Sequence, residues 1–88
     1  MKTKNGFRLR ELGGDYILIG ESMELVNFDK LVTFNATAAY LWRNVEGKEF
    51  TLDTLTRLLT EEYEVDASTA EHDAQHTLNC WIQAGIIE

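Results

Sequence analysis

The chain has 88 residues, a formal net charge of −7, one cysteine and no proline. This length supports one domain with a modest hydrophobic core, and an apolar fraction of 44% excludes a disordered chain. The negative charge argues against binding to nucleic acid, because that affinity depends on lysine and arginine. A single cysteine rules out an internal disulfide and fits a reducing cytosol, so we expect a cytoplasmic protein. No signal peptide is visible and no apolar run approaches the ~20 residues of a membrane span, so we expect no membrane partner.

The N-terminal third of the chain predicts a small antiparallel sheet. Residues 1–6 are polar and are expected to be disordered. Residues 7–12 and 16–19 flank a Gly-Gly-Asp turn and predict a β-hairpin. Residues 31–34 are β-branched and aromatic, as strands favour, and predict a further strand. We expect residues 21–30 to form a short arm that pairs back on this last strand.

The remainder of the chain predicts three helices. Their approximate bounds are 36–45, 52–63 and 67–84. Each follows a residue whose side chain can cap a helix N-terminus, namely Asn35, Thr51 and Asp66. Apolar residues recur at helical spacing in each segment, and both tryptophans, Trp42 and Trp81, fall on these apolar stripes. Gly47 and Gly85 stand where helix C-terminal glycines belong.

A meander of three or four short strands followed by three helices defines an α+β, winged-helix-like fold. A winged helix that binds DNA would lay its third helix in the major groove. No lysine or arginine follows Arg57, whereas seven acidic residues do: Glu61, Glu62, Glu64, Asp66, Glu71, Asp73 and Glu88. Because the third helix would repel phosphates, DNA binding is the least favoured function, and we expect no nucleic-acid partner.

Three potential metal ligands, His72, His76 and Cys80, are spaced four residues apart on the predicted third helix. A structural zinc site normally takes four protein ligands, and the chain has no second cysteine. We therefore favour two solvated histidines and a half-buried thiol. The acidic residues between positions 61 and 66 fit a solvated surface, and no nucleophile or nucleotide-binding motif is present. We expect no catalytic residue, no metal and no cofactor.

The uncharged strand at residues 31–34 suggests a binding mode. An outer strand of a sheet presents unpaired backbone groups, and exposed edges are commonly protected by charge or proline. This edge has neither, so an extended peptide could add to it as another strand. Residues 23–28, or a second copy of the protein, could cover the same edge instead. The second case would make the protein a self-associating or partner-docking module, such as a homodimer, and the residues alone favour neither alternative.

Several motifs in a fixed order resemble the pyrroloquinoline-quinone biosynthesis protein D (PqqD) family, whose members are also called RiPP recognition elements. They are the strand-Asn-x-Thr-Ala junction at residues 34–38, Trp42, Gly47, the Tyr-x-Val-Asp segment at 63–66 and the Gly-Ile-Ile segment at 85–87. The similarity runs from about residue 7 to residue 87, nearly the whole chain. It therefore implies one PqqD-like domain over residues 1–88.

The resemblance also implies a function. Such domains bind the leader of a ribosomally made precursor peptide and present it to a modifying enzyme, often a radical SAM protein. The leader adds to the third strand and lies against the third helix. Carried onto this chain, the implied peptide contacts are Leu31, Val32, Thr33, Phe34, Asp73, Thr77 and Cys80. Two departures stand out: residues 21–30 are longer than in compact members and could fold over the edge, and the acidic third helix implies a leader with basic residues.

Overall fold

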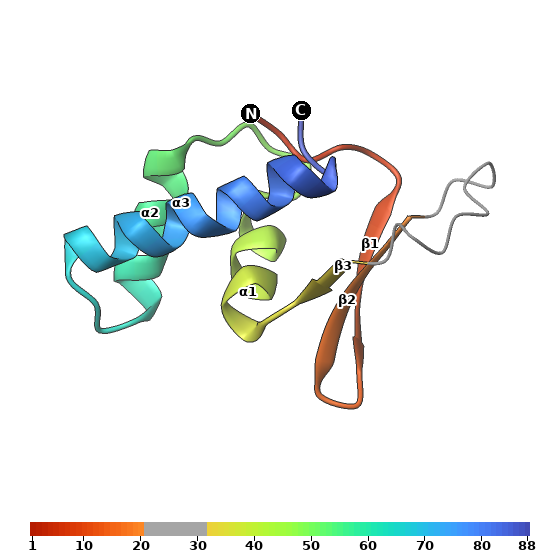
Figure 1. Cartoon of the computed structure of the whole chain (residues 1–88), viewed down its shortest axis with the longest axis horizontal. Helices are drawn as coiled ribbons and strands as arrows, with labels where there is room; N and C mark the ends of the chain where they lie inside the picture. The colour runs from red at the N-terminus through yellow and green to blue at the C-terminus, as the bar shows by residue number, and fades with distance from the viewer. Residues whose placement is uncertain (21–31) are drawn as a thin grey trace.

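The computed structural model describes residues 1–20 and 32–88, in which a small sheet packs beside three helices (Figure 1). The strands are β1 (Phe7–Leu12), β2 (Asp15–Gly20) and β3 (Val32–Phe34), antiparallel and in the order β1-β2-β3. The helices are α1 (Ala36–Val45), α2 (Leu52–Glu62) and α3 (Ala67–Ala84). The predicted α+β fold is confirmed. The arm expected at residues 21–30, which would supply a fourth strand, lies outside the described residues, as does Leu31.

The turn between β1 and β2 fixes the register of the sheet. Leu12 pairs with Asp15, so Gly13 and Gly14 alone form the turn, with φ of 59° and 93°. Two positive φ angles are what a type I′ hairpin turn requires, and glycine adopts them without steric cost. This register places Leu18 between its partners on β1 and β3, on the face that joins the core, where it is fully buried.

The junction between β3 and α1 joins the sheet to the helices. The Oδ1 atom of Asn35 accepts a hydrogen bond of 2.7 Å from the backbone N–H of Ala38, which confirms Asn35 as the N-cap. Immediately before it, Phe34 is buried in an aromatic cluster with Trp42 and Trp81, at ring-centroid distances of 5.8 and 5.9 Å. The strand therefore ends inside the core, and the two predicted core tryptophans lie there with it.

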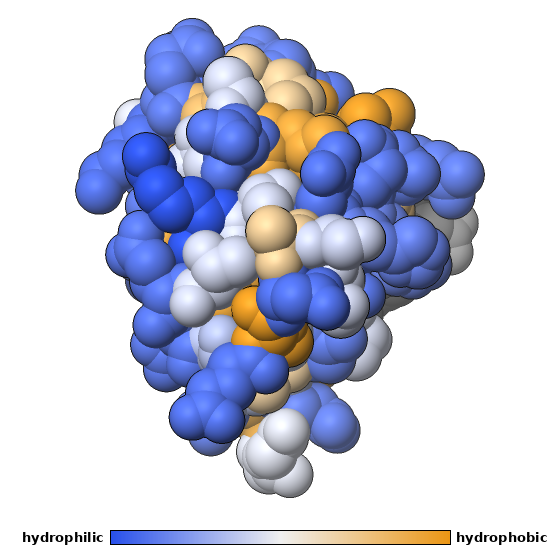
Figure 2. Space-filling view, turned by 90° about the vertical axis from the view of Figure 1, so that its left-hand side faces the viewer, coloured by the Kyte–Doolittle hydropathy of each residue, from blue (hydrophilic) through white to orange (hydrophobic). Residues whose placement is uncertain are grey.

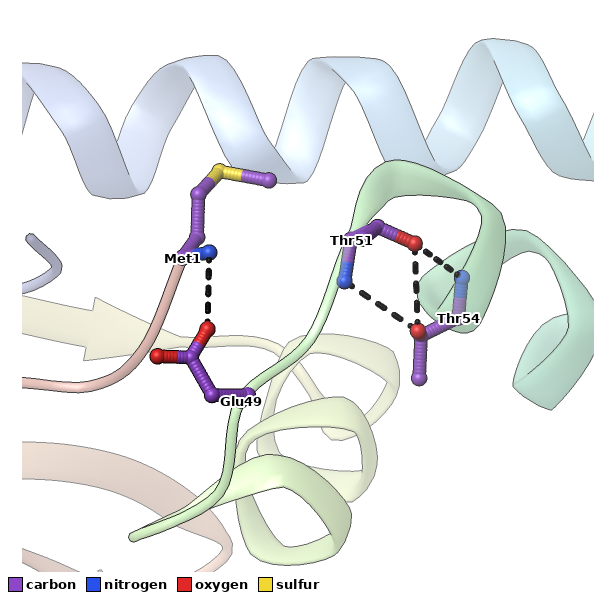
Figure 3. A network of polar contacts seen from close by, with 4 residues as sticks. All are labelled: Met1, Glu49, Thr51 and Thr54. Carbon is purple, nitrogen blue, oxygen red and sulfur yellow. Dashed lines mark hydrogen bonds and ion pairs between the residues drawn. The ribbon is translucent and has the colours of Figure 1, made fainter.

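The other two helices begin and end at residues with capping geometry. Thr51 and Thr54 form a reciprocal capping box at the start of α2 (Figure 3). Asp66 caps α3 by accepting a hydrogen bond of 2.7 Å from the N–H of Thr69, and Gly85 ends that helix in the left-handed conformation. The predicted caps are confirmed at all three positions.

The cap at Asp66 makes stability depend on pH. The backbone hydrogen bond from Thr69 is the main cause that lowers the pKa of Asp66 below its ordinary value. Folding thus favours the charged carboxylate, so the cap contributes fully above the unfolded pKa of about 3.9 and its contribution is lost as pH falls through the lowered pKa. We expect Asp66→Ala to lower the melting temperature at neutral pH, and we expect this difference from the wild type to disappear in strong acid. A difference in melting temperature that does not change with pH would contradict this expectation.

The N-terminus differs from the prediction of disorder at residues 1–6. The N–H of Lys2 donates to the carbonyl of Glu88 at 3.0 Å, and the N–H of Glu88 donates back to Lys2 at 2.8 Å. The N–H of Lys4 donates to the carbonyl of Ile86 at 3.0 Å. These bonds use main-chain groups, so the polar side chains from which disorder was predicted do not oppose them. The two ends of the chain consequently lie side by side (Figure 1).

Thr3 connects this N-terminal segment to the loop after α1. Its side chain is 3% exposed, and its Oγ1 accepts a hydrogen bond of 2.9 Å from the N–H of Gly47. Thr3→Val keeps the shape but leaves that N–H without its acceptor, so we expect a loss of about 1–2 kcal/mol in the free energy of unfolding, measured with urea. Thr60→Val, at an exposed position, serves as the control and should change it by less than about 0.5 kcal/mol. Equal effects would show that Thr3 has no buried role.

Candidate functional site

A groove of about 130 Å³ lies between the end of the sheet and α3. One wall comes from β3 and the start of α1, and the other from the second half of α3. The lining residues are Val32, Thr33, Phe34, Asn35, Ala38, His76, Thr77, Cys80 and Trp81. The groove exists because Asn35 ends the strand and turns the chain into α1, while α3 packs on the same aromatic cluster as Phe34.

The strand wall of the groove is the outermost of the described strands. Within the described sheet β3 pairs with β2 only, which leaves its other side without a described strand partner. Thr33 is exposed, whereas Val32 is half-buried and Phe34 is buried. An outer strand of this kind can extend its sheet by main-chain hydrogen bonds to a further strand.

The helix wall combines a buried floor with a polar rim. Trp81, 1% exposed, forms the floor, and Thr77 lies half-buried beside it. The Sγ atom of Cys80 lies 3.9 Å from Nε2 of His76. Cys80 is exposed, so the prediction of a half-buried thiol was wrong: position 80 lies at the mouth of the groove and not between packed elements. Among the described residues, no three His, Cys, Asp or Glu side chains are grouped as metal ligands would be.

The structure brings five of the predicted contact residues together in this groove. They are Val32, Thr33, Phe34, Thr77 and Cys80. Asp73 lies one helical turn before Thr77 and lines a second depression, of about 150 Å³, with Thr37, Leu59, Tyr63 and Val65. Leu31 lies outside the described residues. That any of these residues contacts a peptide stays a prediction.

Sequence reasoning did not assign four of the groove residues to this site: Asn35, Ala38, His76 and Trp81. Asn35 and Trp81 were assigned only capping and core roles, which they also fill. A signal for His76 was available, because it precedes Cys80 by four residues and so lies on the same side of the helix. When one residue of a helix lines a groove, the residues one turn away on the same face are expected to line it too.

Negative charge dominates the end of the molecule where α2 meets α3. Glu61, Glu62 and Glu64 are exposed there, as predicted for a solvated acidic surface. Partial burial raises the pKa of the Tyr40 hydroxyl, and the neighbouring carboxylates of Glu62 and Glu61 raise it further. The side of the molecule that carries this end is largely hydrophilic, with apolar residues in small areas (Figure 2).

The fold and the groove together define a class: a winged-helix-like α+β domain whose last described strand runs beside a groove against its last helix. The model of the family described as coenzyme PQQ synthesis protein D (PqqD) matches residues 23–87. The chain therefore belongs to the PqqD family, and the predicted family is confirmed.

One solved structure supports the fold independently. It is described as TbiB1 in complex with the TbiA(beta) leader peptide, and it aligns with a TM-score of 0.73 at 19% sequence identity. The alignment covers 100% of this chain and 95% of that one. No curated protein sequence matches the chain significantly. None of the helices in the described ranges has the length and apolar character needed to cross a membrane.

Proposed function

We propose that this protein is a non-catalytic adaptor that captures the leader of a ribosomally synthesised precursor peptide and presents it to a modifying enzyme. The observation that carries the proposal is the position of β3, the outermost described strand on its side of the sheet, whose residues also line the groove against α3. Membership of the PqqD family supports it. So does the similarity of the fold to TbiB1, whose structure contains a leader peptide.

In strand addition, the backbone and the side chains of the leader would have different roles. Main-chain hydrogen bonds to β3 would set the register of the leader irrespective of its sequence. Alternate side chains of an added strand point to one face, so every second residue of the leader would enter the groove. There they would meet the buried ring of Trp81 and the half-buried Thr77. This division explains how one short strand could hold a peptide and still select among peptides.

The proposed partner is an enzyme that modifies the precursor, such as a radical SAM protein. An adaptor that holds the leader near such an enzyme raises the effective concentration of the peptide at the active site without any chemistry of its own. This role needs no catalytic residue in the adaptor, which agrees with the absence of catalytic motifs from the sequence.

Titration of the ¹⁵N-labelled protein with short peptides encoded by neighbouring genes tests the proposal. We expect amide shift changes concentrated at residues 32–34 and 76–81. A mass that rises with protein concentration, with no response to any peptide, would show self-association through the same edge and overturn the proposal. Salt-sensitive binding to duplex DNA would overturn it in favour of a DNA-binding winged helix.

A further inference from the structure

We infer that Asp73 selects leaders that carry a lysine or arginine on the amino-terminal side of the segment that pairs with β3. The inference rests on the proposed function and names the chemistry of its ligand. It places a specificity-determining residue outside the groove that holds the paired strand.

The depression beside Asp73 adjoins the groove, and both α3 and α1 contribute residues to each of them. On α3, Thr77 lines the groove, and Asp73, one turn earlier, lines the depression. On α1, the adjacent residues Ala38 and Thr37 line the groove and the depression respectively. A peptide that leaves the groove toward the N-terminal end of α3 therefore passes Asp73.

The depression combines an apolar floor with a carboxylate. Leu59, 3% exposed, and the half-buried Val65 line it together with the ring of Tyr63. The side chain of Asp73 is 57% exposed, and its ion-pair partner among the described residues is His72 at 3.8 Å, which is charged only when protonated. Lysine and arginine match this surface, because their aliphatic stems cover apolar groups while the charged head reaches a carboxylate.

Apart from His72, no side chain of the protein's own C-terminal part that could carry positive charge competes for this position. The chain has no lysine or arginine after Arg57, and Arg57 lies 3.7 Å from Glu61. The rings of Tyr40 and Tyr63 meet edge to face at 6.1 Å, so Tyr40, whose pKa is raised by burial and by the carboxylates of Glu62 and Glu61, lies against a residue of the depression wall. A basic residue of the ligand would supply the charge that this end of the molecule lacks.

The direction of β3 fixes where the basic residue belongs. The chain runs from β3 to Thr37, so the depression lies beyond the C-terminal end of the strand. Both strand pairings in the described sheet are antiparallel, and an antiparallel leader would place its amino-terminal residues there. Asp73 and Cys80 are about 10 Å apart along the axis of α3, a distance that an extended peptide spans in about three residues.

Selection from a displayed library of random 12-residue peptides, made against the full chain, tests the inference. Peptides selected by the wild-type protein should share a lysine or arginine about three residues before an apolar, strand-forming segment. Asp73→Lys should instead select aspartate or glutamate at that place, and Asp73→Asn should lose the preference. Glu71→Lys changes the net charge equally but lies on another side of α3, so it should keep the wild-type preference.

The outcomes separate this inference from the proposed function. If no peptide is selected, or if selected peptides leave the amide signals of β3 unshifted, both are overturned. If selected peptides shift those signals but show no basic preference, or if Asp73→Lys and Glu71→Lys alter the preference alike, only the role of Asp73 is overturned. For a selected peptide, lysine→glutamate at the shared place should weaken binding to the wild type at least about tenfold, and Asp73→Lys should restore most of that loss.

Discussion

Replacing Trp81 by alanine is expected to lower the free energy of unfolding by about 3–5 kcal/mol, the largest stability change we anticipate for a single substitution. Trp81 is 1% exposed and contacts three other rings, from Phe34, Trp42 and Phe50, at centroid distances of 5.9, 5.3 and 6.2 Å. Those rings come from β3, from α1 and from the loop before α2. Removing the indole therefore leaves a cavity where the sheet and the helices meet.

The next residue on α3 provides the control. Ile82 is 56% exposed, so Ile82→Ala should change the free energy of unfolding by less than about 0.5 kcal/mol. Both variants are compared with the wild type by urea unfolding, followed by circular dichroism. A loss below about 1 kcal/mol for Trp81→Ala would show that the aromatic cluster does not hold the two layers together.

The second large effect concerns peptide binding, which Thr77→Arg should weaken by about 2 kcal/mol, or roughly 30-fold. Thr77 is half-buried in the helix wall of the groove, so an arginine there would occupy the space proposed for the side chains of the leader. The affinity of a selected peptide, measured by calorimetry, reports the change. The melting temperature should change little, because the longer side chain can point out of the groove when no peptide is bound.

Gln75→Arg adds the same charge and length to a different face of α3. Residues 75 and 77 lie about 200° apart around a helix, and Gln75 is exposed, so its substitution should leave the affinity within about twofold. Equal losses of peptide affinity for both variants would show that the added charge causes the effect and that the position in the groove does not.

Local signals were sufficient to predict the helices. Asn35, Thr51 and Asp66 combine a capping side chain with an apolar stripe that starts within the next turn, and each helix begins directly after its cap. The hairpin follows from two adjacent glycines between β-forming segments. Each of these features depends on residues that are near one another in the chain.

Long-range features were harder to predict. The N-terminal segment was expected to be disordered because its pairing partners lie at the other end of the chain, near Ile86 and Glu88. Phe50, 2% exposed, joins the core from a loop, where no periodicity marks it as buried. The groove beside β3 and the depression beside Asp73 were likewise merged into one predicted site. Spacing on α3 places Asp73 and Thr77 on one face but does not show which residues of α1 and α2 lie opposite each.

The most direct test of strand addition to β3 is a scan of single N-methyl groups along a selected peptide. N-methylation removes one backbone donor without changing the side chain, and only alternate amides of an edge-added strand face β3. We expect the affinity to fall at least about tenfold at every second residue of the paired segment and to hold at the residues between. Losses that follow side-chain identity, or that show no alternation, would contradict strand addition.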